Sequence, residues 1–254
     1  MEYWEKWLEY AENDLKASRL LYDNKDYRNA IYHLQQSEEK LSKAFLAKNT
    51  SIMTDKTAIT FGHAWHEVLA KLVLGLNIYS KIDLNQPSKE FLELNSRKTD
   101  PNPSNEEVVE LCSEISKKIN DIDNPSPELQ KALNESGDKY KDTFSIPAIE
   151  NELKHVNDNP TFKHFIPGKL NDNIIKEKLK EYESNKGDIS EYVNKMIPKF
   201  LFLIPMMMLS SLLVSHEKYA RYPSEIDYEK HAIKTNYEKV YYILETLINN
   251  VKKS

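Results

Sequence analysis

An arginine and a histidine stand five residues apart near the N-terminus, as Arg28 and His33 in the segment DYRNAIYHLQQSEEKLSKAFL. A histidine can take up a proton and an arginine can stabilise negative charge on a phosphate, so such a pair could carry out acid–base chemistry at a phosphate ester. The segment has a helical pattern, however, and five residues turn a helix by roughly 140° beyond a full turn. Both side chains therefore reach one phosphate only if the helix kinks. Two interpretations stay open: a catalytic pair, or an exposed arginine and histidine on the polar side of a packed helix.

The same segment carries a polar stripe at helical spacing. Its members follow one another at steps of four, three, four and three residues: Asn29, His33, Gln36, Lys40 and Lys43. A solvated helix face held by local pairs would explain this stripe. The adjacent Gln35 and Gln36 are not needed for that purpose, because their amides suit a buried polar network or the edge of a nucleobase. We keep Gln36, Lys40 and Lys43 as candidate residues for binding RNA or a nucleotide.

A second group of candidates lies before the last helical pattern and consists of His216, Arg221, Tyr222 and His231. Pro223 breaks the chain after Tyr222, so we expect Arg221 at a helix end, where a cleft could form. There Arg221 would hold a phosphate while Tyr222 stacks on a base. The alternative is a structural corner, in which Tyr222 packs on the preceding helix.

A pair of histidines three residues apart, His63 and His66, stands beside Glu67 and invites a metal interpretation. No third ligand follows at motif spacing, so we expect no metal and no cofactor here. We keep His63 as a candidate binding residue. The single cysteine, Cys112, excludes an internal disulfide framework, and its apolar helical stripe places it in the core.

The elements that must position these residues are helices. Apolar residues recur at three- and four-residue steps, and no segment longer than a few residues alternates with a period of two. The predicted helices cover about 3–23, 27–48, 61–80, 105–122, 172–182 and 226–252. A short polar turn separates the first two, with Asp26 as the cap of the second, so they should form a hairpin.

The prolines divide the chain into regions. Nine of the eleven fall between residues 85 and 199, and each marks the end of an element because proline fixes φ and lacks a donor. We therefore predict an all-α fold with two parts. An up-and-down bundle of four to five core helices is formed by 1–84 and 197–254, and a proline-rich helical insertion of unknown role occupies 85–196.

Composition excludes several classes of function. The net charge of −5 gives no positive field that would attract nucleic acid from a distance. Five scattered glycines are too few for a phosphate-binding loop of the Walker or dinucleotide type. Residues 200–215 carry no charge, but they are too short to span a bilayer and contain Pro205, so a buried helix is favoured over a membrane segment. We expect a cytoplasmic protein without a targeting segment.

Several of these sequence segments resemble motifs of the HEPN superfamily (higher eukaryote and prokaryote nucleotide-binding domain). Ala11, Asp14 and Leu15 match its A-x-x-D-L-x-x-A motif, in which the last small residue departs by one position, with Ala17 and Ser18 near the expected place. Its Q-Q-x-x-E-K-x-x-K-A motif is matched by Gln35, Gln36, Glu39, Lys40, Lys43 and Ala44. Gly62-His63 resembles its histidine at a helix start, and Ala220-Arg221-Tyr222-Pro223 resembles its A-R-Y-P element. The resemblance covers about 1–80 and 200–250.

The resemblance implies a helical bundle that is commonly a homodimer, and a function in recognising RNA or a nucleotide. Many HEPN proteins are metal-independent endoribonucleases that act as toxins or defence effectors, with the catalytic text R-x(4–6)-H. Arg28 and His33 match that text, although they lie in the first hairpin rather than at the start of a later helix. The alternative is a catalytically inactive interaction module that binds a partner such as a minimal nucleotidyltransferase, which serves as the antitoxin.

Overall fold

The structure is a computed structural model in which residues 2–49, 102–128, 130–131, 201–221 and 225–253 are described. Within these ranges every regular element is a helix, which confirms the predicted all-α fold for this part of the chain. The chain divides into two compact units, one formed by Met1–Asp123 with Leu201–Ser254 and the other by Asn124–Phe200. All helices discussed below belong to the first unit.

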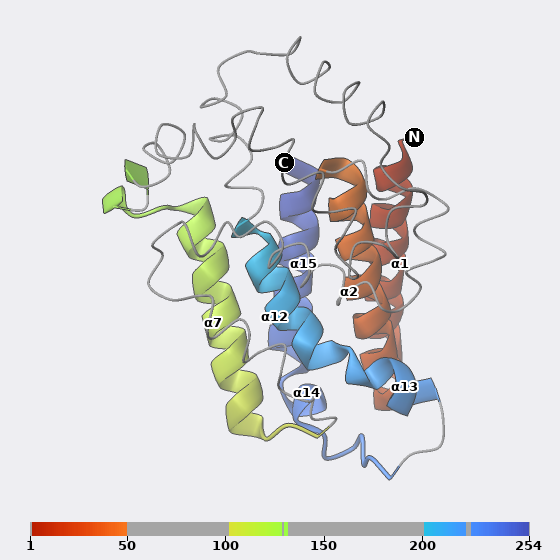
Figure 1. The fold of residues 1–254 in the computed structure, drawn as a ribbon. Coiled ribbons are helices and arrows are strands. Elements are labelled where there is room, and N and C mark those ends of the chain that lie inside the picture. Colours follow the sequence, from red (N-terminus) through yellow and green to blue (C-terminus); the bar gives the residue numbers. More distant parts are fainter. Residues whose placement is uncertain (1, 50–101, 129, 132–200, 222–224, 254) are drawn as a thin grey trace, which may run out of the picture. The chain divides into compact units, whose positions relative to one another are not determined.

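Two long helices, α1 (Tyr3–Asp23) and α2 (Tyr27–Asn49), form the predicted hairpin (Figure 1). Lys25 in the turn has φ of 64°, a left-handed conformation that reverses the chain. The side chain of Asp26 accepts a hydrogen bond from the N–H of Asn29 at 3.4 Å, as expected of a helix cap. Both helices agree with their predicted limits to within one residue.

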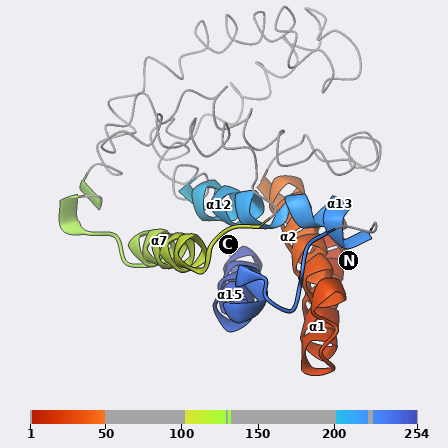
Figure 2. The ribbon, with the colours of Figure 1, turned by 90° about the horizontal axis from the view of Figure 1, so that it is seen from below.

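Helix α2 is the central element of the described bundle. Its buried residues run without a break from Leu34 to Glu39, which a helix with only one covered face cannot provide. Helix α1 packs along one side, and α12 (Leu203–Leu213) and α13 (Ser215–Arg221) pack on another (Figures 1 and 2). The predicted burial of the apolar segment around Pro205 is confirmed. None of the helices in the described ranges is long and apolar enough to cross a membrane.

The C-terminal helix α15 (Tyr237–Lys253) completes the core around the hairpin. It packs against α1 and α2, and Tyr237 is fully buried. The prediction of one helix over 226–252 is wrong at its start, because a short helix α14 (Ala232–Thr235) precedes α15. The side-chain amide of Asn236 donates to the carbonyl of Ala232 at 3.0 Å and ends α14.

Helix α7 (Asn105–Asp123) packs against α12 and α15, on the side away from the α1–α2 hairpin (Figure 2). Its buried stripe includes Cys112, whose thiol pKa burial raises to about 11, so the predicted core position is confirmed. The helix was predicted, but as part of the 85–196 insertion; in space it packs with the bundle helices. The predicted helices at 61–80 and 172–182 lie outside the described residues.

Candidate functional site

The register between α1 and α2 is fixed by two buried serines. The hydroxyl of Ser18 donates to the carbonyl of Ala30 at 2.8 Å, and that of Ser37 donates to the carbonyl of Ala11 at 2.7 Å. Small side chains that bond to the opposite backbone let two helices approach closely. This register places Asp14 of α1 opposite the α2 residues from position 33 to position 40.

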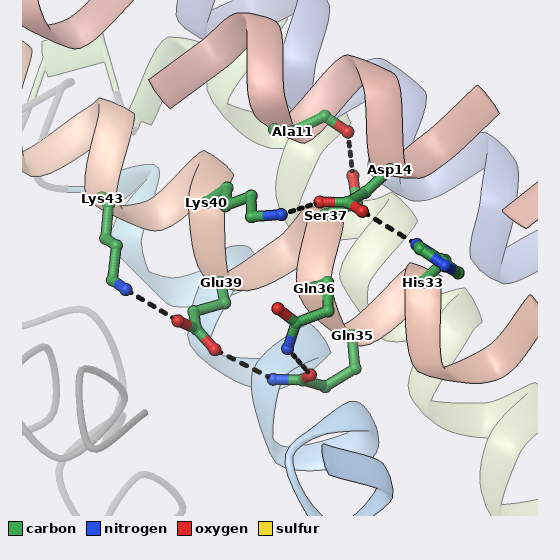
Figure 3. A network of polar contacts seen from close by, with 9 residues as sticks. All are labelled: Ala11, Asp14, His33, Gln35, Gln36, Ser37, Glu39, Lys40 and Lys43. Carbon is green, nitrogen blue, oxygen red and sulfur yellow. Dashed lines mark hydrogen bonds and ion pairs between the residues drawn. The ribbon is translucent and has the colours of Figure 1, made fainter. Parts of the chain in front are cut away.

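Asp14 joins two of the candidate residues into one cluster (Figure 3). One carboxylate oxygen lies 2.8 Å from Nδ1 of His33, and the other accepts a hydrogen bond from Nζ of Lys40. The side chains of His33 and Lys40 are 30% and 25% exposed, whereas that of Asp14 is only 12% exposed. We call these three residues the hairpin cluster. It is a carboxylate–imidazole pair next to an ammonium group, at a surface that solvent reaches.

The charge state of Asp14 follows from its neighbours. Burial raises the pKa of Asp14, but the hydrogen bonds from His33 and Lys40 and the positive charge beside the carboxylate outweigh that effect, so its pKa lies below the usual value. Asp14 is therefore ionised at neutral pH. An ionised carboxylate only accepts hydrogen bonds, so the bond to His33 has its proton on Nδ1.

The structure does not bring Arg28 and His33 together. Nε of Arg28 donates to the carbonyl of Ala220 at 2.7 Å, and one guanidinium nitrogen lies 3.5 Å from the carbonyl of Tyr219. Both carbonyls lie in the last turn of α13, where a cation is favourable. Arg28 thus points to α13, and His33 points to α1. The regular α2 keeps the divergence that five helical residues impose.

Gln36 and Lys43 belong to a buried network, not to a solvated face (Figure 3). Gln36 donates to the side-chain oxygen of Gln35 at 2.6 Å, and Gln35 donates to Glu39 at 3.4 Å. Lys43 completes the chain through an ion pair with Glu39 at 2.7 Å and lies over the ring of Trp7. The buried polar network was one of the two alternatives that the paired glutamines suggested.

Glu38, the neighbour of Glu39 in the chain, is also buried. Burial raises its pKa well above the usual range, which the hydrogen bond from Ser42 at 3.2 Å opposes and the charge of Glu39 reinforces. The two adjacent glutamates, Glu38 and Glu39, thus have different surroundings. Glu39 is paired with a cation, whereas burial disfavours the ionised form of Glu38.

The second candidate group forms a buried aromatic corner around α13 and α14. The rings of His216 and His231 lie 4.7 Å apart at right angles, and Tyr228 contacts both. Nδ1 of His216 lies 3.3 Å from the Tyr228 hydroxyl, and Nδ1 of His231 accepts the N–H of Ile233 at 3.1 Å. We call His216, Tyr228 and His231 the aromatic corner.

The aromatic corner is closed to solvent. His216 is 0% and His231 is 1% exposed. Burial lowers the pKa of His216 to about 3, and the neighbouring His231 acts in the same direction. The Arg28 guanidinium lies close enough to lower the pKa of Tyr228, although burial raises that pKa to about 12 overall. Of the predicted binding residues in this region, Arg221 is exposed at the end of α13.

Two of the predicted site residues, His63 and Tyr222, lie outside the described residues. In the described ranges, no group of three His, Cys, Asp or Glu side chains is placed to hold a metal ion. The sequence reasoning did not select Asp14 and Tyr228 as site residues. Asp14 could have been found from its place on α1, where an acid follows the aromatic residues Trp7 and Tyr10 at helical spacing.

The arrangement defines an α-helical bundle protein with a polar cluster on its first hairpin. Residues 4–61 match the family model of the HEPN domain, which confirms the resemblance to HEPN proteins for α1, α2 and the residues that follow them. No curated protein and no solved structure matches the chain. The HEPN match supports a function related to nucleotides or RNA in general.

Proposed function

We propose that the protein recognises RNA through the hairpin cluster and cleaves it as a metal-independent endoribonuclease that acts as a toxin or defence effector. The observation that carries this proposal is the Asp14–His33 pair at 2.8 Å, with Lys40 on the same carboxylate and the imidazole partly open to solvent. A histidine held in this way can take a proton from a ribose hydroxyl. A neighbouring ammonium can stabilise charge that develops on the phosphate.

The roles follow from the placement of the side chains. His33 is the proposed base, and Lys40 is the cation beside it, because Arg28 binds the carbonyls of α13. Arg221 is a proposed phosphate contact outside the hairpin. Gln36 and Lys43 remain proposed binding residues only for a state in which their buried network opens. The resemblance to HEPN proteins implies a homodimer, in which two copies of the chain would supply two hairpin clusters.

The experiment is cleavage of total RNA by the purified full-length protein in buffer that contains EDTA. We expect cleavage that survives EDTA and is lost in His33→Ala. Lys40→Ala should weaken cleavage more than Lys48→Ala, a matched lysine of the same helix whose Nζ binds the Val251 carbonyl. Full activity in His33→Ala would contradict the proposed base.

A second candidate function is a catalytically inactive interaction module that binds a partner protein such as a minimal nucleotidyltransferase. The observation that favours it is the divergence of Arg28 and His33, which leaves the R-x(4–6)-H text unassembled within a protomer. Wild-type protein would then fail to cleave RNA but bind the purified nucleotidyltransferase in a titration. Absence of both activities would exclude both candidates.

A further inference from the structure

The two nitrogens of the His33 ring have different surroundings. Nδ1 is bound to Asp14, whereas no hydrogen bond to Nε2 is found among the residues that the structure describes. The ring also lies edge-on to the ring of Tyr32, with 5.5 Å between the ring centroids. A histidine ring held at one nitrogen and open at the other is arranged for proton transfer at the open nitrogen.

The carboxylate of Asp14 is itself held from two sides. His33 and Lys40 approach it from different turns of α2, one at each oxygen (Figure 3). The register bond from Ser37 to the Ala11 carbonyl lies between them and prevents α1 from sliding along α2. The two bonds use different oxygens of the carboxylate, so Lys40 does not compete with His33 for its acceptor.

This arrangement assigns the tautomer of His33. A neutral imidazole carries its single N–H on one of its two ring nitrogens. The hydrogen-bond partners of these nitrogens decide which one carries the proton. An acceptor at Nδ1 fixes the proton there and leaves the lone pair on Nε2. Without Asp14 the ring has no described acceptor, and a neutral histidine then carries its proton mainly on Nε2, which removes the base from the open side.

We propose that Asp14 is a positioning residue that holds His33 in the Nδ1–H tautomer, so that Nε2 is the nitrogen that takes the 2′-hydroxyl proton of an RNA substrate. The inference rests on the proposed function for its substrate. In the step, Nε2 takes the proton, the 2′-oxygen bonds to the adjacent phosphorus and the bond from phosphorus to the 5′-oxygen breaks. The leaving 5′-oxygen gains the proton that His33 took, so the products are a cyclic phosphate end and a 5′-hydroxyl end.

The tautomer can be measured without any substrate. Protein labelled with ¹⁵N at histidine gives ring nitrogen shifts in a long-range ¹H–¹⁵N spectrum, and these distinguish a protonated from an unprotonated nitrogen at neutral pH. We expect His33 in wild type to show a protonated Nδ1 and an unprotonated Nε2. In Asp14→Ala the assignment should reverse, and Asp14→Glu should restore it at least in part.

Matched variants separate positioning from folding. Asp23→Ala removes an exposed acid of the same helix and should leave the tautomer unchanged. Lys40→Ala keeps the bond from Asp14 to His33 and should also keep the Nδ1–H form, which provides the test if Asp14→Ala fails to fold. An Nε2–H tautomer in wild type, or in folded Lys40→Ala, would overturn the inference.

RNA cleavage provides a second readout, which is measured separately from the NMR spectrum. In the RNA cleavage assay, Asp14→Ala should lower kcat roughly 10- to 100-fold with little change in KM, as part of the 10²–10⁴-fold that acid–base catalysis supplies. A purely structural Asp14 would leave kcat per folded molecule unchanged, which overturns the inference. If wild type does not cleave RNA, the proposed function fails, and the NMR measurement still decides whether Asp14 sets the tautomer.

Discussion

Two regions of this protein hold histidine in opposite ways. In the hairpin cluster, His33 is partly exposed and bound to a charged carboxylate. In the aromatic corner, His216 is fully buried and bound to the neutral hydroxyl of Tyr228. The first environment offers a nitrogen to solvent next to a cation, and the second offers none. Burial, rather than residue type, thus decides which of the two histidine rings is accessible to solvent.

The aromatic corner lies next to another candidate residue, Arg28, which joins helix α2 to α13. Arg28 of α2 binds the carbonyls of Ala220 and Tyr219, and its charge reaches Tyr228. His231 caps α14 through the N–H of Ile233. The arginine of the candidate catalytic text thus attaches the corner to the hairpin, and the histidine of that text remains available at the surface.

The largest expected effect separates the two histidines by activity. His33→Ala should lower RNA cleavage by about 100-fold or more, because it removes the proposed base, while the thermal midpoint changes little at this partly exposed position. His216→Ala should leave kcat of the folded fraction intact. It should lower the free energy of unfolding by about 2 kcal/mol or more, because it empties a buried site. Cleavage kinetics and thermal unfolding of both variants check this, and a reversed assignment would contradict the comparison.

The next effect is a pH dependence of the free energy of unfolding, which we expect from His216 in the aromatic corner. The folded pKa of His216 is lowered to about 3 from the ordinary 6.5, so below pH 6.5 the unfolded chain binds a proton that the folded protein excludes. The contribution of this neutral histidine is fully present above pH 6.5 and is lost as pH falls toward 3. Between pH 6.5 and 4.5 the free energy of unfolding should fall by about 2 kcal/mol.

Denaturant titrations at several pH values between 4.5 and 7 measure this slope. His216→Phe removes the titrating group while it keeps a buried ring, and it should flatten the slope by close to one proton. An unchanged slope in that variant would show that other groups cause the acid sensitivity.

The smallest expected effect is a difference in stability between variants of two cations, Arg28 and Lys40. Arg28→Ala should cost about 2 kcal/mol of stability, because two carbonyls at the end of α13 lose a charged donor. Lys40→Ala should cost less than about 1 kcal/mol, since its pair with Asp14 is partly exposed. Hydrogen exchange locates the effect: amides near residues 219–231 should exchange faster in Arg28→Ala and not in Lys40→Ala. Equal losses in both variants would contradict the assignment of Arg28 to the corner.

Local patterns were sufficient for much of the fold. The limits of α1 and α2, the Asp26 cap and the burial of the segment around Pro205 follow from apolar spacing and capping chemistry within a few residues of one another. The break at Asn236 was missed. Both the side-chain amide and the backbone N–H of Asn236 bond to the carbonyl of Ala232 in the preceding turn, and the apolar spacing continues across the break.

The candidate sites needed information that no local pattern contains. The chain itself determined that Arg28 and His33 diverge, because their separation on a regular helix fixes the angle between them. The directions that they take were decided by partners distant in the chain, since Asp14 stands 19 residues before His33 and Ala220 stands 192 residues after Arg28. The physical reason is that hydrogen bonds and burial depend on which helix surfaces meet, and only packing of the bundle brings those surfaces together.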